Sequence, residues 1–351
     1  MNGTENTLVN PKSKSLYFLQ QCRFWIPNVV APIIFIIGLF GNVMTIIVLT
    51  RKRMSGSTNT YLTALAVSDL LYLIFYMTLS LEHHMSDTKY ILYWKYWRFA
   101  VWFADATVAI STWLTVSFTL ERYIAVCHPL KGKVVCTEAR ARKVIGFVVM
   151  FCLISTVTTP FEWNTQININ PETNKTTVIQ YSSLGKNKTY KTIFYWFSGI
   201  TFVFIPLILL GTLNYLLINA VRISQQKRKN LTEGNSRKNY KEKQENKITT
   251  ALVAVVFLFL FCQGPSAITL ILSIFYNPEE GTDGYNIVHG VGNIFNLLLA
   301  VNAAFNFLLY CAMSDKYRQT MYRTFCPSLA INHQRANTFS SNASYRSSMH
   351  R

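Results

Sequence analysis

The stretch IPNVVAPIIFIIGLFGNVMTIIVLT, residues 26–50, contains no charged side chain. A helix of about 20 apolar residues crosses the ~30 Å hydrocarbon core of a bilayer, so this stretch is long enough to span a membrane. The whole chain of 351 residues is 50% hydrophobic and only 14% charged, which separates it from ordinary soluble domains. The sequence therefore predicts a membrane protein.

Six more apolar stretches follow the first, and two of them enclose an acid, Asp69 or Asp105. The six are residues 59–81, 97–126, 144–161, 193–221, 251–277 and 285–314. Backbone in lipid must satisfy its own hydrogen bonds, which only helices or closed barrels achieve, and these runs do not alternate as barrel strands do. The predicted fold is an all-α membrane protein, a bundle of seven transmembrane helices.

The distribution of Lys and Arg predicts the orientation of the bundle. The loops after the first, third and fifth spans hold seventeen of these residues, and the loops after the second, fourth and sixth hold seven. Basic loops stay in the cytoplasm, so we expect an extracellular N-terminus and a cytoplasmic C-terminus. The net charge of +18 then reflects topology, and we expect the lipid bilayer as a partner and no nucleic acid.

We divide the chain into four parts. Residues 1–25 are an extracellular tail, 26–314 the bundle, 315–326 an amphipathic cytoplasmic helix and 327–351 a disordered cytoplasmic tail rich in Ser and Asn. Glycosylation signals on the outer side begin at Asn2, Asn174 and Asn187. Cys326, at the end of the amphipathic helix, is either a palmitoylation site or an unmodified thiol.

Several polar side chains lie within the apolar spans. Asp69 is in the second span, and Ser111, Asn302 and Asn306 lie at middle or inner depths of other spans. Polar groups at this depth are costly and usually face the interior of the bundle. One buried carboxylate with neutral oxygen donors can hold a monovalent cation, and the alternative is a purely structural hydrogen-bond network.

The third span ends in the adjacent charges Glu121 and Arg122. Glu245 lies at the inner end of the sixth span. If these spans adjoin, Arg122 can pair with either acid, which would give two bundle arrangements with different ion pairs. We interpret this group as a switch at the cytoplasmic end.

Together these residues carry a family resemblance. The motifs, in chain order, are Gly41-Asn42-Val43, Leu65-Ala66-Val67-Ser68-Asp69, Glu121-Arg122-Tyr123, His128-Pro129-Leu130, Pro206, Cys262-Gln263-Gly264-Pro265 and Asn306-Phe307-Leu308-Leu309-Tyr310. The chain resembles the rhodopsin-like (class A) G-protein-coupled receptors over about four fifths of its length. Within them it looks most like invertebrate FMRFamide-type neuropeptide receptors.

The resemblance implies the function of a receptor and not of an enzyme. It implies that Glu121 holds Arg122 at rest, that Tyr123, Asn306 and Tyr310 belong to the same switch, and that the inner end binds a heterotrimeric G protein. A sodium ion would act as an allosteric ligand of Asp69 and its neighbours, with no other cofactor. Arrestin and receptor kinases would act on the tail, and the chain would reside in the plasma membrane.

The sequence departs from this family at four places. Gln263 replaces the usual Trp of the sixth span, Phe307 the usual Pro of the seventh, and Met150 lies where the fourth span usually has Trp. Trp97 stands where the outer end of the third span usually has Cys, and the loop 161–191 has no Cys. An extracellular disulfide is therefore not available, and packing of Trp94, Trp97 and Trp163 is a candidate replacement.

The outer ends of the spans combine acids and aromatic rings. The predicted ligand-binding residues are Glu82, Trp102, Asp105, Trp196, Gln263 and Tyr276. Acids beside rings suit the Arg-Phe-amide end of a neuropeptide, through ion pairing and cation-π contacts. Amine receptors of the family carry Asp at the position of Ala104, which disfavours an amine here. A small amine or a lipid ligand is nevertheless the alternative to a peptide. A transporter is a more distant alternative, because the internal repeats it predicts are not evident.

Overall fold

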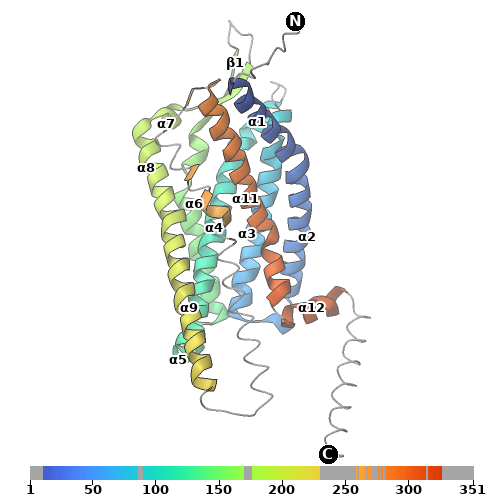
Figure 1. Ribbon diagram of the computed structural model, residues 1–351, viewed down its shortest axis with the longest axis vertical. Coiled ribbons are helices and arrows are strands. Elements are labelled where there is room, and N and C mark those ends of the chain that lie inside the picture. The colour runs from blue at the N-terminus through green and yellow to red at the C-terminus, as the bar shows by residue number, and fades with distance from the viewer. Residues whose placement is uncertain are drawn as a thin grey trace, which may run out of the picture.

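A computed structural model describes residues 11–85, 90–169, 176–229, 258, 261–265, 268–269, 276, 278–279, 281–313 and 315–325. Within this part, six helical segments are long and apolar enough to cross a membrane. Most of the expected span 251–277 lies outside the described residues, although residues 261–265 of it are helical. The helices run side by side as one elongated bundle (Figure 1).

The first span is preceded by a helix. α1 (Pro11–Trp25) continues through the π-helical turn η1 (Ile26–Val30) into α2 (Ala31–Leu49). Proline removes an N–H donor and displaces the preceding turn, and the wider π turn absorbs this change next to Pro27 and Pro32. Residues that we assigned to the N-terminal tail are thus helical from Pro11.

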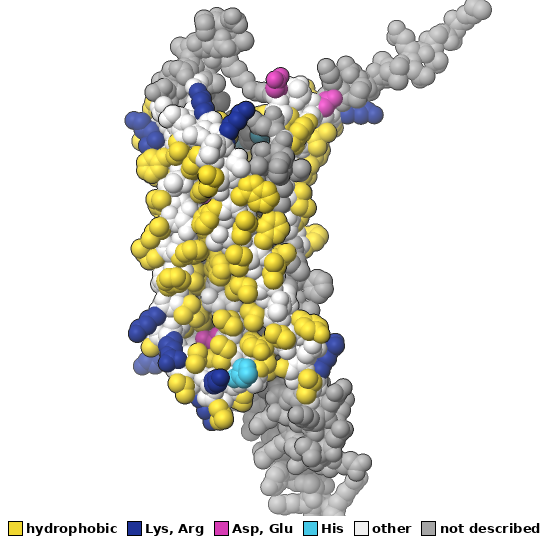
Figure 2. Space-filling view, turned by 90° about the vertical axis from the view of Figure 1, so that its left-hand side faces the viewer, with side chains coloured by type: hydrophobic (Ala, Val, Ile, Leu, Met, Phe, Trp, Pro, Cys, Tyr) yellow, Lys and Arg dark blue, Asp and Glu magenta, His cyan; other side chains and the backbone are white. Residues whose placement is uncertain are grey.

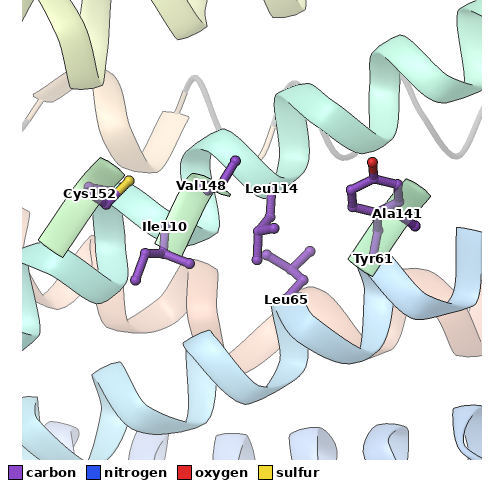
Figure 3. Packing of buried hydrophobic residues seen from close by; sticks show 8 residues of the cluster. Tyr61, Leu65, Ile110, Leu114, Ala141, Val148 and Cys152 are labelled. Carbon is purple, nitrogen blue, oxygen red and sulfur yellow. The ribbon is translucent and has the colours of Figure 1, made fainter. Parts of the chain in front are cut away.

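The next three spans form the centre of the bundle. They are α3 (Ser57–Leu79), α4 (Ile91–Cys127) and α6 (Glu138–Ser155), joined by η2 (Lys52–Met54), η3 (Ser80–His84) and the short helix α5 (Pro129–Val135). Leu65 of α3, Leu114 of α4 and Val148 of α6 are buried in one hydrophobic cluster (Figure 3). α4 is the central helix, since it contacts α3, α6 and α9.

The fifth span consists of α8 (Lys188–Gly199), a second π turn η6 (Ile200–Phe204) and α9 (Ile205–Lys229). This π turn precedes Pro206, so the fifth span, like the first, has a π turn next to a proline. The last span is α11 (Asp283–Met313), which packs against α2 and α3. Large apolar side chains form a band on the outer surface of the bundle, with Lys and Arg at its two ends (Figure 2), as expected for a lipid-facing surface.

α2 and α11 approach each other closely because glycines lie at their contact. A Cβ atom on Gly41 would lie 2.1 Å from Cδ1 of Phe307, and one on Gly38 would lie 3.0 Å from Cα of Ala304. Phe307 therefore fills a notch in α2. Since Phe, unlike Pro, keeps its backbone N–H, α11 continues as helix through this position.

α12 (Asp315–Phe325) follows α11 and runs across the end of the bundle (Figure 1). Tyr317 is 1% exposed and packs with Val48 and Met54, and its hydroxyl lies 3.2 Å from Oγ1 of Thr45. This contact fixes α12 beneath α2.

A hairpin that the sequence analysis did not anticipate covers the opposite end of the bundle. β1 (Trp163–Ile169) pairs antiparallel with β2 (Thr176–Tyr181), with Trp163 opposite Tyr181 and an irregularity between Thr165 and Asn168. The 3-10 turn η5 (Thr159–Phe161) precedes it, and α7 (Ser183–Lys186) leads into α8.

Candidate functional site

The half of the bundle nearest the hairpin encloses a cavity of about 470 Å³, here called the outer cavity. Its walls come from α1, η1, α3, η3, α4, η5, α8, η6 and α11, together with Thr156 just after α6 and Gln263 of the sixth span. Its charged lining residues are Arg23, Glu82 and Asp105, and its aromatic ones include Tyr76 and Tyr195. A volume in this range suits a small ligand or the end of a peptide.

Three of the six predicted ligand residues line this cavity. Asp105 projects from α4 and is solvent-accessible within it. Glu82, from η3, accepts a hydrogen bond of 3.3 Å from the indole N–H of Trp97, and Gln263 is buried in the lining. In the described part of the chain, the Asp105 carboxylate has no hydrogen-bond or ion-pair partner, so it is available to a ligand.

The other three predicted ligand residues lie outside the lining. The Trp102 indole N–H donates to Oγ1 of Thr156 on α6 at 3.0 Å. Trp196 is 39% exposed, and Tyr276 is 51% exposed with its hydroxyl against Gly284 at the start of α11. Adjacent helix positions point in different directions, so the neighbour of a cavity residue can face another helix, as Trp102 does.

The cavity also contains residues that the sequence analysis missed. Asn293 and Asn296 line it from α11, one turn apart, and Arg23 lines it from α1. The two asparagines belong to a stripe of polar residues in an apolar helix, a signal that could have identified them. Arg23 had no such signal because it precedes the first apolar run.

Aromatic rings hold the hairpin against the bundle. The ring of Trp163 lies 5.2 Å from that of Trp97, edge to face, and stacks at 4.4 Å on that of Tyr181. Trp94 extends the group, 5.8 Å from Trp97. The packing of Trp94, Trp97 and Trp163 predicted from sequence is therefore present, and we call these three residues with Tyr181 the aromatic clasp.

Glu162 anchors the corner beside the aromatic clasp. Its Oε1 accepts a hydrogen bond of 2.9 Å from the hydroxyl of Tyr190, and its backbone carbonyl accepts one of 2.8 Å from the Ser182 N–H. Burial raises the pKa of the Glu162 carboxyl, against the opposing effects of Tyr190 and of the nearby Lys191 ammonium. Burial also raises the pKa of Tyr181, with a further contribution from the Glu162 charge. The Lys191 ammonium lies 3.7 Å above the Tyr181 ring, so a cation-π contact also stabilises the packing around Glu162.

The predicted cation site lies at mid-bundle and is assembled around Asp69. Its two oxygens accept hydrogen bonds from Ser111 at 2.8 Å and from Asn306 at 2.6 Å. Asn302 is buried one turn before Asn306. Asn42 donates to the carbonyls of Gly38 at 2.9 Å and Ala303 at 3.1 Å, and its buried Oδ1 has no partner among the described residues. The Asp69 carboxylate and the Asn42 amide oxygen are oxygen ligands of the kind that hard cations prefer.

Three of the predicted switch residues, Glu121, Arg122 and Tyr123, lie at the other end of α4, whereas Asn306 lies beside Asp69. Oε1 of Glu121 accepts hydrogen bonds from Arg122 at 3.0 Å, Ser57 at 2.9 Å and Thr58 at 3.4 Å. Glu121 is 7% exposed and Arg122 26% exposed, so the acid is buried and the base reaches the surface. The ring of Tyr123 packs edge to face with that of His128 at 5.9 Å.

Several predicted residues cannot be placed. Glu245, Asn2, Asn174 and Cys326 lie outside the described residues, and for Tyr310 only the helical backbone is described. Asn187 is exposed and caps α8, because its side-chain oxygen accepts a hydrogen bond of 3.1 Å from the Tyr190 N–H.

Comparison with known proteins agrees with this arrangement. The family described as serpentine type 7TM GPCR chemoreceptor Srw matches residues 29–328. The FMRFamide receptor of Drosophila melanogaster is 29% identical over 316 residues, which cover 86% of this chain and 54% of that receptor. The sex peptide receptor of Drosophila melanogaster is 28% identical, covering 84% of this chain and 71% of that protein. The mouse thyrotropin-releasing hormone receptor is 27% identical, covering 83% and 76%.

Proposed function

Because the chain belongs to the serpentine seven-transmembrane G-protein-coupled receptor family, we propose that it couples binding of an extracellular peptide to activation of a heterotrimeric G protein. The similar receptors named above are named for peptides, which supports a peptide ligand here. The chain spans only about half of the Drosophila FMRFamide receptor, and so its ligand is argued from the outer cavity.

The accessible carboxylate of Asp105 carries this proposal. An accessible carboxylate that has no partner among the described residues favours a ligand that brings a positive charge. The walls around it are aromatic, with Tyr76 and Tyr195 among them, and an aromatic side chain next to the cation would pack there. An Arg-Phe-amide peptide end combines both groups.

At the inner end, Arg122 is the residue that would contact the G protein once Glu121 releases it. We also propose a plasma-membrane location with the N-terminus outside, which places the outer cavity toward extracellular peptides and the exposed Asn187 toward the glycosylation machinery. Arrestin and receptor kinases remain proposed partners of the Ser-rich C-terminal tail.

A sodium ion is the proposed allosteric ligand of Asp69, with Ser111, Asn302 and Asn306 as the further oxygen donors. Such an ion would supply positive charge to a buried carboxylate. Agonist affinity measured in sodium chloride and in N-methylglucamine chloride tests this proposal: a sodium effect that Asp69→Asn removes supports it, and an effect unchanged in Asp69→Asn refutes it.

The experiment that tests the peptide proposal is a calcium and cAMP assay in cells that express the chain, with pools of amidated peptides with and without Arg-Phe-amide ends. Asp105→Asn should raise the half-maximal concentration of an active cationic peptide at least about thirtyfold, since truncating one partner of a buried charge pair costs about 2 kcal/mol or more. The matched control is Glu279→Gln, which removes an exposed acid outside the cavity.

Equal potency in Asp105→Asn and wild type would refute the proposed site. A wild type that responds to amines and to no peptide would favour a small amine, the second ligand class that a lone carboxylate can bind.

A further inference from the structure

α1 is docked on α11 by specific contacts. Oγ of Ser15 donates to Oδ1 of Asp283 at 2.5 Å and accepts from Nδ2 of Asn286 at 3.2 Å. Ser15 and Asn286 are 8% and 5% exposed, so this polar group is shielded from water. A Cβ atom on Gly290 would lie 2.4 Å from Cε1 of Phe18, which shows that the Phe18 ring packs directly on the backbone of α11. These contacts fix the rotation of α1 about its axis.

The docking of α1 places Arg23 in the wall of the outer cavity, together with Ile26 and Pro27 of η1. Arg23 is the cationic residue of the described lining and interacts electrostatically with Glu82. Among the described lining residues, opposite charges thus lie near Glu82, and one further acid, Asp105, lies elsewhere.

The spacing between these two charged regions can be estimated from α4. Glu82 contacts Trp97, and Trp97 precedes Asp105 by eight residues. Eight residues of α-helix rise about 12 Å, and an extended peptide covers that length in about three or four residues.

We propose that α1 forms part of the ligand-binding site and that Arg23 selects ligands with a negatively charged residue about three positions before the cation that binds Asp105. The proposal rests on the proposed function as a peptide receptor. Because Arg23 interacts with Glu82, a basic ligand residue must compete with Arg23 for that acid, whereas an acidic ligand residue can pair with the guanidinium.

The test uses three synthetic peptides that differ at one position: Asp-Ala-Leu-Arg-Phe-amide and its analogues that begin with Asn or Lys. The measured quantity is the ratio of half-maximal concentrations of the Lys and Asp peptides, in the calcium and cAMP assay at equal surface expression. Wild type should favour the Asp peptide. Arg23→Gln should reduce the ratio about tenfold, and Arg23→Glu should reverse the preference.

Lys14→Gln is the matched control, because it removes a positive charge from the same helix outside the cavity lining. A second variant, Phe18→Ala, leaves Arg23 in place but removes the ring that packs on Gly290, and it should also reduce the ratio. A ratio that changes as much in Lys14→Gln as in Arg23→Gln refutes the proposal, since it would reflect net charge alone.

Two outcomes separate this proposal from the function on which it rests. If the peptides activate the receptor and Arg23→Glu leaves the ratio unchanged, the role of Arg23 is refuted and the peptide receptor stands. If no peptide of any pool activates the wild type at confirmed surface expression, the peptide function is refuted and the selection by Arg23 with it.

Discussion

Replacing Trp163 with Ala should release the hairpin from the bundle without unfolding the bundle. The ring of Trp163 makes two aromatic contacts, with Trp97 at 5.2 Å and with Tyr181 at 4.4 Å. Each such pair contributes about 0.5–1.5 kcal/mol beyond the area that it buries. The substitution should therefore lower the free energy of local opening by about 1–3 kcal/mol, which corresponds to roughly a 5- to 150-fold increase in the open population.

Hydrogen exchange measured by mass spectrometry on the purified protein in nanodiscs reports this population directly. In Trp163→Ala, amides of β1 and β2 should exchange roughly 5- to 150-fold faster than in wild type. Amides of α3 and α4 on the side of the aromatic clasp away from the hairpin should keep their protection. Trp25→Ala is the control, because Trp25 is 51% exposed on α1 and pairs with Phe24 and Gln21 instead of the hairpin. Equal exchange of the hairpin in Trp163→Ala and wild type would refute the reasoning that rings hold this loop.

Three further predictions concern other contacts. Burial raises the pKa of the Glu162 carboxyl above its ordinary value of 4.5. The protonated carboxyl therefore stabilises the folded hairpin below pH 4.5, and this stability is lost as the pH rises through the raised pKa. Protection of the hairpin amides from exchange should fall over this pH range in wild type and not in Glu162→Gln. Gly41→Ala places a Cβ atom against Phe307 and should lower thermal stability in detergent by about 1–3 kcal/mol, and adding Phe307→Ala should recover part of the loss, whereas additive losses would exclude direct contact. Ser57→Ala removes one hydrogen bond to the charged Glu121, worth about 1.5 kcal/mol, and should raise basal G-protein signalling up to roughly tenfold; unchanged basal signalling at equal surface expression would exclude Ser57 from the switch.

The helical architecture could be predicted from the sequence because burial in lipid leaves a plain signal. Uncharged runs such as residues 26–50 and 193–221 are expected to form helices in a bilayer, and the structure has helices there. Helix α1 could not be predicted in this way, since its sequence is polar. Ser15 and Leu19 of α1 are buried, and such tertiary contacts stabilise a short helix. Local sequence does not predict these contacts.

The hairpin between residues 163 and 181 was missed for a related reason. Two-stranded hairpins are marginal on their own. This one lies against α4 through Trp163, whose partner Trp97 is 66 positions earlier in the chain. The sequence indicated that Trp97 and Trp163 could pack together, but it did not indicate the strand pairing that brings Tyr181 onto the same ring.

The candidate site was partly predictable. Acids in apolar spans are rare enough to mark Asp69 and Asp105 as functional candidates, and the structure surrounds one with amide and hydroxyl donors and leaves the other facing the outer cavity. The sequence does not distinguish functional aromatic residues in the same way, because an aromatic ring can face the lipid, the protein core or a cavity. Trp102 and Tyr76 could not be told apart until the neighbouring helices were known, and only Tyr76 lines the cavity.

The aromatic clasp has a consequence for how this protein responds to redox conditions. The chain has no Cys between Cys22 and Cys127, nor between Cys152 and Cys262, so no disulfide can join the third span to the outer loop. Thiol reductants, which cut the covalent tether in receptors that have one, find no bond to cut at this position. The contact of Trp163 with Trp97 needs no oxidant to form, and the affinity of the protein for its ligand should be the same with and without dithiothreitol.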